Sequence, residues 1–408
     1  MKILQINNYH YLKGGSEKVY FETSRILEDN GDNEVIHFSV CNDKNFNSRN
    51  SSYFIKQRKY DTLLNKLINL ISFFYSFEAK RKLSELIKDE KPDIAHVHIF
   101  YGRLTSSILG VLRKYNIPIV MTIHEYKMLC PQYLFLNDKG NICEKCANGN
   151  TIFCVINRCN KGSFLNSFIS AVEVKLRDIF FNYERNIDMF IFVSSFVYNK
   201  HIEYIPSLKD KSIVLNNTVD FSRFKPLEKK GNYFLYFGRL SKEKGILNLL
   251  IVAGYDKSIN YKIIGNGPLS SEVKAIIEEN NLYNVELLGP KYNDDLITTI
   301  QDSSFVISPS MVYETFGLSI LESFACSKPV IASDIGAFPE LVNKERGYLF
   351  DYLNTKSLFD AVNKANKLDY KSYIHLSREA LKFANENFKE QSYYDNLMNI
   401  YIKLLDEK

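Results

Sequence analysis

The stretch Phe305-Val-Ile-Ser-Pro-Ser310, continued by Glu314-Thr-Phe-Gly-Leu-Ser-Ile-Leu-Glu322, has the pattern of a strand, a turn and a helix. Phe305–Ile307 is a short apolar run, typical of a strand buried on both faces of a sheet. Apolar residues from Phe316 to Ala325 recur with a helical period, and we expect this helix to start near Thr315–Gly317. A buried strand leading into an amphipathic helix is the repeating unit of a parallel α/β sheet.

The same alternation of apolar runs and helical patterns extends over almost the whole chain. One set of predicted strands comprises Ile3–Asn7, Glu34–Ser39, Ile94–His98, Ile119–Ile123, Met189–Val193 and Ile213–Leu215. A second set comprises Tyr233–Phe237, Tyr261–Ile264, Val285–Leu287, Phe305–Ile307, Pro329–Ala332 and Tyr348–Phe350. Strands that alternate with helices predict parallel, doubly wound sheets, here two of them.

The length of 408 residues also favours two domains. A polar, charged stretch over 216–231 predicts the linker, so we expect an N-terminal domain over 1–215 and a C-terminal domain over 216–388. A Cys-bearing insertion interrupts the first domain at about 130–160. Residues 389–408 have the pattern of one amphipathic helix, which we expect to pack back on the N-terminal domain.

Charge and hydropathy exclude some classes of protein. The net charge of +5 is mild and does not argue for nucleic acid as a partner. No apolar run is long enough for a membrane-spanning helix. The N-terminal residues read as a strand and lack the pattern of a signal peptide, so the expected location is cytoplasmic.

Two glycine-containing turns follow predicted strands of the second set, where ligands of open α/β sheets bind. Gly238-Arg-Leu-Ser-Lys-Glu-Lys-Gly245 places Arg239 and Lys244 on a turn, which suits a diphosphate. Gly265-Asn-Gly267 would let the backbone approach a ligand closely. Taken alone, each segment is also compatible with an ordinary surface turn.

The segment from Glu314 to Glu322 is the strongest indication of a site. The N-terminus of its helix would present free N–H groups and a positive dipole end to an anion. Eight residues of helix rise about 12 Å, so one glutamate could lie beside a sugar and the other beside a ribose. A helix with one capping and one surface glutamate is the alternative.

These segments resemble the nucleotide-sugar site of glycosyltransferase family 4. The resemblance is carried by Tyr313–Ser323 and by Lys328-Pro-Val-Ile-Ala-Ser-Asp-Ile-Gly-Ala-Phe-Pro-Glu340, and it covers the C-terminal half. It continues more loosely in Gly14-Gly15-Ser-Glu17 and in Thr122-Ile-His124-Glu-Tyr126. It departs from the family at Glu125, where Asp is usual, and at Thr218, where Gly is frequent.

The resemblance implies a GT-B fold, with two Rossmann-like domains facing across a cleft, and a retaining glycosyltransferase. Arg239 and Lys244 would neutralise the departing diphosphate, Glu314 would bind the donor sugar, and Glu322 would bind the ribose. The implied donor-binding residues are Gly14, Gly15, Gly238, Arg239, Lys244, Gly265, Gly267, Leu288, Glu314, Phe316, Gly317, Leu318 and Glu322. The donor would be a nucleotide sugar, with a UDP-sugar favoured over a GDP-sugar.

The implied catalytic residues are His124, Glu314, Arg239 and Lys244. Negative charge that grows on the leaving phosphate would be stabilised by the two cations and the helix dipole. The resemblance places His124 near the reacting carbon, although a single histidine after a strand is often structural. We expect no catalytic role for His96 or His98. No Asp-x-Asp motif follows a strand, so we expect no catalytic metal.

The cysteines of the insertion allow two interpretations. Cys143-x2-Cys146 and Cys154-x4-Cys159 have spacings that suit a structural zinc ion. Free thiols in a flexible insertion are the alternative.

A basic segment over residues 53–82 holds seven Lys or Arg and two Asp or Glu. Apolar residues fall on one side of a helix drawn through it: Leu63, Leu67, Leu70, Ile71, Phe74 and Phe77. Phe164–Tyr183 is a second segment of this kind. Both resemble interfacial helices that bind anionic lipid, at the inner face of the cytoplasmic membrane, although a core-facing helix with a basic outer face fits as well.

The sequence thus predicts transfer of a sugar from a nucleotide-diphosphate donor to a saccharide or lipid-linked oligosaccharide acceptor in bacterial surface polysaccharide synthesis. A small-molecule or sugar-phosphate glycosyltransferase and a non-catalytic partner protein of the same fold are the alternatives.

Overall fold

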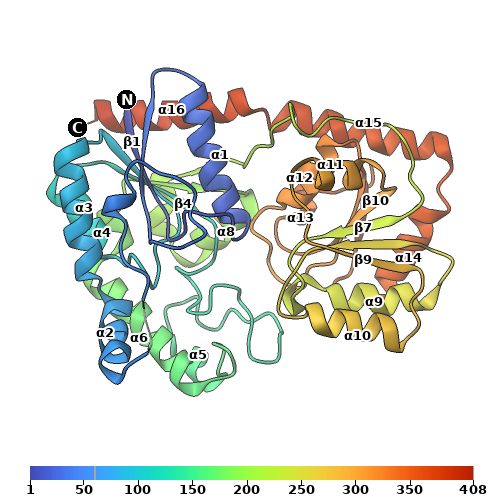
Figure 1. Cartoon of the computed structure of the whole chain (residues 1–408), viewed down its shortest axis with the longest axis horizontal. Helices are drawn as coiled ribbons and strands as arrows, with labels where there is room; N and C mark the ends of the chain where they lie inside the picture. Colours follow the sequence, from blue (N-terminus) through green and yellow to red (C-terminus); the bar gives the residue numbers. More distant parts are fainter. Residues whose placement is uncertain (59–60, 408) are drawn as a thin grey trace. The chain divides into compact units, whose positions relative to one another are not determined.

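The computed structural model describes residues 1–58 and 61–407; the side chains of residues 63, 64, 66 and 67 also lie outside the description. The chain divides into two compact units (Figure 1). The first unit comprises residues 1–193, 197–215 and 391–408, and the second comprises 194–196 and 216–390.

The first unit is built on a parallel six-stranded sheet in the order β2-β1-β3-β4-β5-β6. Its strands are β1 (Lys2–Ile6), β2 (Glu34–Phe38), β3 (Ile94–Val97), β4 (Ile119–Ile123), β5 (Met189–Phe192) and β6 (Ser212–Val214). The helices of this part of the chain are α1 (Gly15–Asp29), α2 (Leu63–Phe74), α3 (Phe77–Glu90), α4 (Ser107–Lys114), α5 (Ile152–Ile156), α6 (Phe164–Phe180), α7 (Tyr183–Asn186) and α8 (Ser195–Tyr204). Short 3-10 turns lie at Ser51–Tyr53 and Pro206–Lys211.

The C-terminal helix α16 (Glu390–Asp406) also packs in the first unit (Figure 1). Leu397 and Ile400 join a buried cluster with Ile3, Val120 and Ile191 of the strands. These apolar contacts fix α16 against the sheet, and Thr23 and Tyr393 add a hydrogen bond of 2.9 Å between their hydroxyls.

The second unit has a parallel sheet of the order β12-β11-β10-β7-β8-β9. Its strands are β7 (Phe234–Phe237), β8 (Tyr261–Ile264), β9 (Val285–Gly289), β10 (Phe305–Ser308), β11 (Val330–Ser333) and β12 (Gly347–Phe350). Its helices are α9 (Ile246–Tyr255), α10 (Ser270–Glu279), α11 (Asn293–Gln301), α12 (Leu318–Ala325), α13 (Phe338–Leu341), α14 (Thr355–Asn366) and α15 (Tyr370–Asn387), with a 3-10 turn at Lys242–Lys244.

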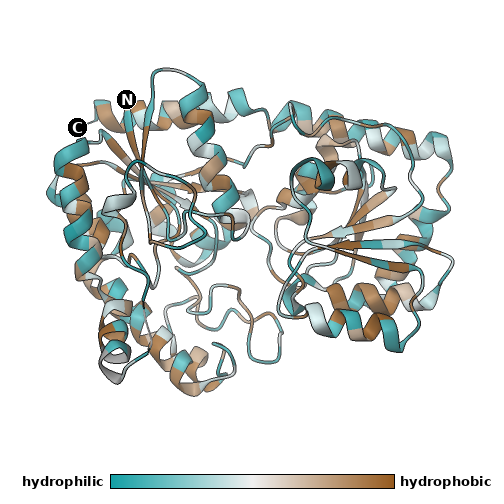
Figure 2. Cartoon of the chain, viewed as in Figure 1, coloured by the Kyte–Doolittle hydropathy of each residue, from teal (hydrophilic) through white to brown (hydrophobic). Residues whose placement is uncertain are grey.

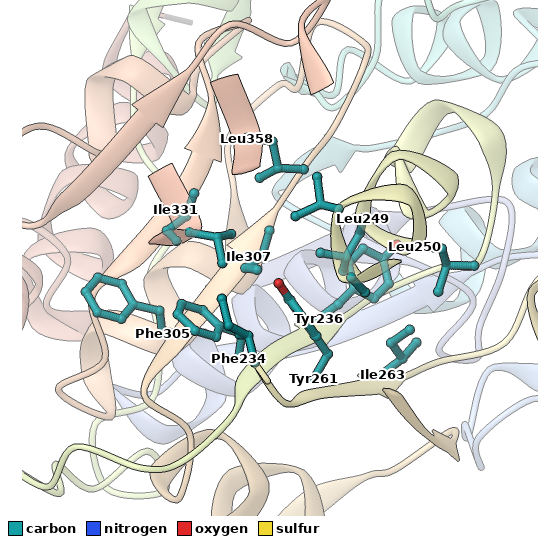
Figure 3. Close-up of a cluster of buried hydrophobic side chains, with 14 of the residues drawn as sticks. Phe234, Tyr236, Leu249, Leu250, Tyr261, Ile263, Phe305, Ile307, Ile331 and Leu358 are labelled. Carbon is teal, nitrogen blue, oxygen red and sulfur yellow. The ribbon is translucent and has the colours of Figure 1, made fainter. Parts of the chain in front are cut away.

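The core of the second unit explains why its strands read as continuous apolar runs. Phe234 and Phe305 stack on neighbouring strands with their ring centroids 6.0 Å apart, and Leu249 of α9 covers the same cluster (Figure 3). Because helices cover both faces of a parallel sheet, almost every residue of a strand is buried. The twelve predicted strands are therefore confirmed, with ends that differ by one or two residues.

The two sheets differ in strand order. The second unit has the order 3-2-1-4-5-6 when its strands are numbered from β7, which is the Rossmann order, while the first unit has the flavodoxin-like order 2-1-3-4-5-6. In both, the order reverses beside the first strand, between β1 and β3 or between β7 and β10. Ligands of such folds bind outside the carboxyl ends of the strands at this switch point.

Candidate functional site

The switch point of the second unit gathers the charged residues that the sequence singled out. The 3-10 turn Lys242–Lys244 follows β7, and Glu314 lies in the segment that follows β10. The Nζ of Lys244 lies 2.6 Å from Oε1 of Glu314, so an ion pair joins the two sides of the switch point. Glu314 is the more buried of the two, with 16% of its side chain exposed against 36% for Lys244.

Ser310 completes the support of Glu314, and the sequence analysis missed it. Its hydroxyl donates a hydrogen bond to the same Oε1 that Lys244 contacts. The backbone carbonyl of Glu314 accepts a hydrogen bond of 2.9 Å from the N–H of Ala337, which follows β11. Two donors on one carboxylate oxygen fix the orientation of Glu314, and they leave Oε2 available for a ligand hydroxyl.

Two glycines let the loops after β7, β10 and β11 come into backbone contact. A Cβ on Gly245 would lie 1.7 Å from the carbonyl oxygen of Pro309, and one on Gly336 would lie 2.4 Å from the amide nitrogen of Glu314. Both residues also have a left-handed backbone, with φ of 69° and 64°. A larger residue would displace the backbone of Pro309 at position 245 and that of Glu314 at position 336.

Helix α12 begins at Leu318, with Gly317 as its N-cap at φ 133°, close to the predicted start. Gly317 has no capping side chain, so the first N–H groups of α12 are free to bind an anion. The predicted 12 Å of helix between the two glutamates is wrong, because Glu314 lies before the helix. Only the turn from Leu318 to Glu322 is helical, a rise of about 6 Å. Glu322 is buried on α12.

The remaining predicted donor residues of this unit lie on β7, β8 and β9 or directly after them. Gly238 and the exposed Arg239 follow β7, and a Cβ on Gly265 would lie 1.8 Å from the carbonyl oxygen of Gly238. Gly267 has a similar contact with the backbone of Leu240, so these turns form one backbone layer. Leu288 lies on β9, which β8 and β7 separate from β10 and Glu314. Phe316 buries its ring against Phe388, which leaves its backbone for a ligand.

In the first unit, Gly14 and Gly15 lie at the N-terminus of α1, after β1. Gly15 is the first helical residue and Gly14 is the N-cap, without a capping side chain. Both are exposed. The start of α1 therefore presents unpaired N–H groups that could contact an anionic ligand.

His124 follows β4 and belongs to a stack of three imidazoles. The ring centroids of His96 and His98 are 4.5 Å apart, and those of His98 and His124 are 5.1 Å apart. Nε2 of His124 lies 2.8 Å from Nδ1 of His98. Burial lowers the pKa of His124 and of His96 to about 3, so both rings are neutral at neutral pH.

Glu125, the departure from the family pattern, lies among charges of the first unit. Burial raises its pKa to about 7, against the opposing effect of the nearby Lys127 and Arg177. Arg177 is itself paired with Glu173 at 2.9 Å and donates to the carbonyl of Lys127 at 3.1 Å. This ion cluster connects α6 with the segment after His124, and the sequence analysis did not identify it because Glu173 and Arg177 are far from that segment along the chain.

The cysteines of the insertion do not support the zinc interpretation. Within residues 1–58 and 61–407, no group of three or more His, Cys, Asp and Glu side chains is arranged to hold a metal ion. Cys154 and Cys159 pair with each other through a hydrogen bond between their thiols, which raises the pKa of Cys154 and lowers that of Cys159. Cys146 is buried, and Cys143 is only partly buried. The described residues thus show no arranged metal site, and the structural zinc at Cys143, Cys146, Cys154 and Cys159 stays a prediction.

The predicted basic helix over residues 53–82 is broken. α2 ends at Phe74, and α3 starts at Phe77 after Ser76, whose side chain caps it. The side chains of Leu63 and Leu67 lie outside the described residues. Leu70, Ile71 and Phe77 are exposed. No helix in the described part of the chain is long and apolar enough to cross a membrane.

Helices α5 and α6 pack together and carry exposed apolar residues, and Figure 2 colours parts of both ribbons as hydrophobic. We call these residues the α5–α6 surface, which consists of Ile152, Ile156, Phe164, Leu165, Phe168, Ile179 and Phe180. Phe180 is 67% exposed and Phe164 is 60% exposed. Water-exposed apolar clusters of this size mark binding surfaces in folded proteins.

Two family models match this chain. The model of glycosyltransferase family 4 matches residues 13–223, and that of the glycosyl transferases group 1 matches residues 218–383. The chain therefore belongs to glycosyltransferase family 4, as the motifs around Glu314 predicted.

Named relatives agree with this assignment. An uncharacterized glycosyltransferase of Methanocaldococcus jannaschii is 35% identical over 215 residues, which are 52% of this chain and 57% of that protein. The O-antigen chain mannosyltransferase C of Escherichia coli is 28% identical over 182 residues, 43% of this chain and 48% of that enzyme. The chain thus spans about half the length of these relatives.

Solved structures show the same fold over the whole chain. The structure of HepE from Anabaena in complex with UDP matches with a TM-score of 0.70 at 15% identity, covering 99% of this chain and 100% of that one. The predicted GT-B class of two α/β units is therefore confirmed.

Proposed function

We propose that this protein is a retaining glycosyltransferase that moves a sugar from a nucleotide-diphosphate donor to a saccharide acceptor of a bacterial surface polysaccharide. The observation that carries the proposal is the Lys244–Glu314 pair at the switch point of the second unit. A cation and an oriented carboxylate, beside a free helix N-terminus, match the diphosphate and the hydroxyls of a nucleotide sugar. The O-antigen mannosyltransferase among the relatives supports the class of acceptor.

The donor residues would divide the ligand between them. Arg239 and Lys244 bind the diphosphate, together with the free N–H groups at Gly317 and Leu318. Glu314 accepts a hydrogen bond from the sugar through Oε2, and Glu322 binds the ribose. The close backbone contacts of Gly238, Gly265 and Gly267 leave room for the nucleotide. A UDP-sugar is favoured, and the UDP complex of HepE supports this choice.

The chemical step would depend on charge. Cleavage of the bond between C1 and the phosphate oxygen leaves an oxocarbenium-like sugar and a diphosphate of growing negative charge. Lys244, Arg239 and the α12 dipole stabilise that charge. Because these groups are already in position, they need little rearrangement during the reaction. His124 contacts the reacting sugar, and the leaving phosphate takes the acceptor proton on the same face.

The test compares two lysines of one turn. Lys244→Ala should lower kcat/KM for the best donor in a panel of UDP- and GDP-sugars by about 100- to 1,000-fold, because a preorganised cation is lost. Lys242→Ala is the matched control, since Lys242 is exposed on the same 3-10 turn. Equal activity of the two variants, measured as sugar transfer, would contradict the proposal.

We also propose that the α5–α6 surface binds the cytoplasmic face of an anionic membrane, which would bring the enzyme to a lipid-linked acceptor. The exposed cations Lys145, Arg158, Lys161 and Lys175 lie on or beside α5 and α6. Apolar side chains flanked by cations are the pattern of a surface that inserts between anionic lipids.

Vesicle flotation tests the membrane proposal. Phe164→Glu combined with Phe180→Glu should weaken binding to phosphatidylglycerol-containing vesicles at least about tenfold, since two half-exposed rings lose their burial in lipid. Leu353→Glu is the control, because Leu353 is 71% exposed in the second unit. Wild-type binding that does not require anionic lipid, or that the paired substitution leaves intact, would contradict it.

A further inference from the structure

The histidine stack continues inward from His124 to a buried glutamine. Nε2 of His98 lies 2.8 Å from Oε1 of Gln5, a residue of β1, while Nδ1 of His98 faces Nε2 of His124 at 2.8 Å. Gln5 and His98 are fully buried. Strand β1 and the residues directly after the neighbouring strands β3 and β4 thus contribute one side chain each to a series of hydrogen bonds that ends at His124.

Gln5, at the inner end of this series of hydrogen bonds, decides which atom donates in each of them. A carboxamide oxygen only accepts hydrogen bonds, so Oε1 of Gln5 requires the proton of His98 to lie on Nε2. Burial lowers the pKa of His98 well below its usual value, and a neutral imidazole carries one N–H. Nδ1 of His98 is therefore an acceptor, and Nε2 of His124 must be the donor.

We propose that Gln5, acting through His98, holds His124 in the tautomer with its proton on Nε2 and its lone pair on Nδ1. In this tautomer Nδ1 of His124 accepts a hydrogen bond from a hydroxyl of the donor sugar or the acceptor, and it does not donate one to the diphosphate. Gln5 and His98 are positioning residues for His124. The inference rests on the proposed function only for the role of His124, and the tautomer itself can be measured without substrate.

The orientation of the Gln5 amide decides the tautomer: its Oε1 faces His98, and among the described residues its Nε2 is buried without a hydrogen-bond partner. A reversed amide would place an N–H₂ group against His98 and would invert both hydrogen bonds. A residue without a polar side chain would leave both tautomers of the pair available. Gln5→Leu removes the acceptor at this position.

Nitrogen-15 NMR of histidine-labelled full-length protein at neutral pH tests the inference, with the His124 signals assigned from their loss in His124→Asn. Wild type should show His124 protonated on Nε2, and Gln5→Leu should show a mixture of both tautomers. Tyr401→Phe is the control, because Tyr401 bonds the adjacent His96 at 2.6 Å and is not part of this series of hydrogen bonds. A wild-type His124 protonated on Nδ1, or an unchanged tautomer in Gln5→Leu, would overturn the inference.

Kinetics separate this inference from the proposed function. Gln5→Leu should lower kcat by about 10- to 100-fold, as loss of a supporting residue does, with little change in KM for the donor. A merely structural role would leave the tautomer of His124 unchanged. A shifted tautomer with an unchanged kcat would uphold the assignment and contradict the role given to His124.

Discussion

The two units place different chemistry at the same point of similar sheets. At the switch point of the second unit, charged groups dominate, with Lys244 and Glu314 paired across it. Beside the corresponding point of the first unit, the side chains of Gln5, His98 and His124 are neutral and joined by hydrogen bonds. The fold thus supplies only the position, and the residues on or after each strand decide whether charged or neutral side chains lie there.

The units also differ in the segment after their second strand. In the second unit the chain adds a third strand, β9, on that side of the sheet. In the first unit α2 and α3 occupy the chain between β2 and β3, where the flavodoxin-like order has no strand. That segment contributes no strand to the sheet, and it carries the exposed residues Leu70, Ile71 and Phe77.

The largest expected difference between the two units is in their stability at acid pH, which should fall more in the first unit. Six of the seven histidines, all except His375, belong to the first unit, and burial lowers the pKa of each of the six: His10, His37, His96, His98, His124 and His201. A lowered pKa in the folded state gives stability that is full above the unfolded value of about 6.5 and is lost as the pH falls toward the folded value. At pH 5 each fully buried histidine should cost about 2 kcal/mol.

Hydrogen exchange between pH 8 and pH 4 measures this difference. The strands of the first unit should lose protection before those of the second. Glu125 acts in the opposite direction, since its pKa of about 7 gives stability that is lost as the pH rises through that value. Equal loss of protection in both units at pH 5 would contradict the prediction.

Removing the buried cation of the first unit should have the next largest effect. Arg177→Leu should lower the free energy of unfolding by about 3–5 kcal/mol, because Glu173 loses a partner in a buried position. Arg25→Leu is the control, since its pairs with Glu22 and Asp29 lie at the surface and should contribute less than about 1 kcal/mol. Urea denaturation gives both values, and similar values for the two variants would show that the Arg177 cluster is not desolvated.

Replacing one glycine of each unit by alanine should change the stability of the two units in opposite directions, and by less than the changes above. Gly336→Ala should destabilise the second unit by about 1–3 kcal/mol, because of its left-handed φ and the contact with Glu314. Gly110→Ala should stabilise the first unit by up to about 1 kcal/mol, since Gly110 lies within α4 and its Cβ would meet nothing within 4 Å. Thermal unfolding measures both, and a stabilised Gly336→Ala would disprove the close contact.

The sequence predicted the strands and the donor segment because both are local patterns. Apolar runs such as Phe305–Ile307 are buried whichever strands lie beside them, and the start of α12 is marked by Gly317. Contacts between distant residues left no such pattern. The expected helical spacing of Glu314 and Glu322 failed because the helix begins only after Gly317. Gln5 gave no sign that it bonds His98, which follows another strand. The exposed face of α6 was predictable from its period, whereas the break between α2 and α3 at Ser76 was not.

The placement of α16 has a consequence for the order in which the two units can fold during synthesis. Tyr393, Leu397 and Tyr401 of α16 complete the core of a unit whose strands are all synthesised earlier. On the ribosome the second unit can close around its own core while the first still exposes the sheet surface that α16 will cover. We therefore expect the first unit to complete its core only after Gln391–Lys408 is translated, and a nascent chain stalled before that point to expose an apolar face.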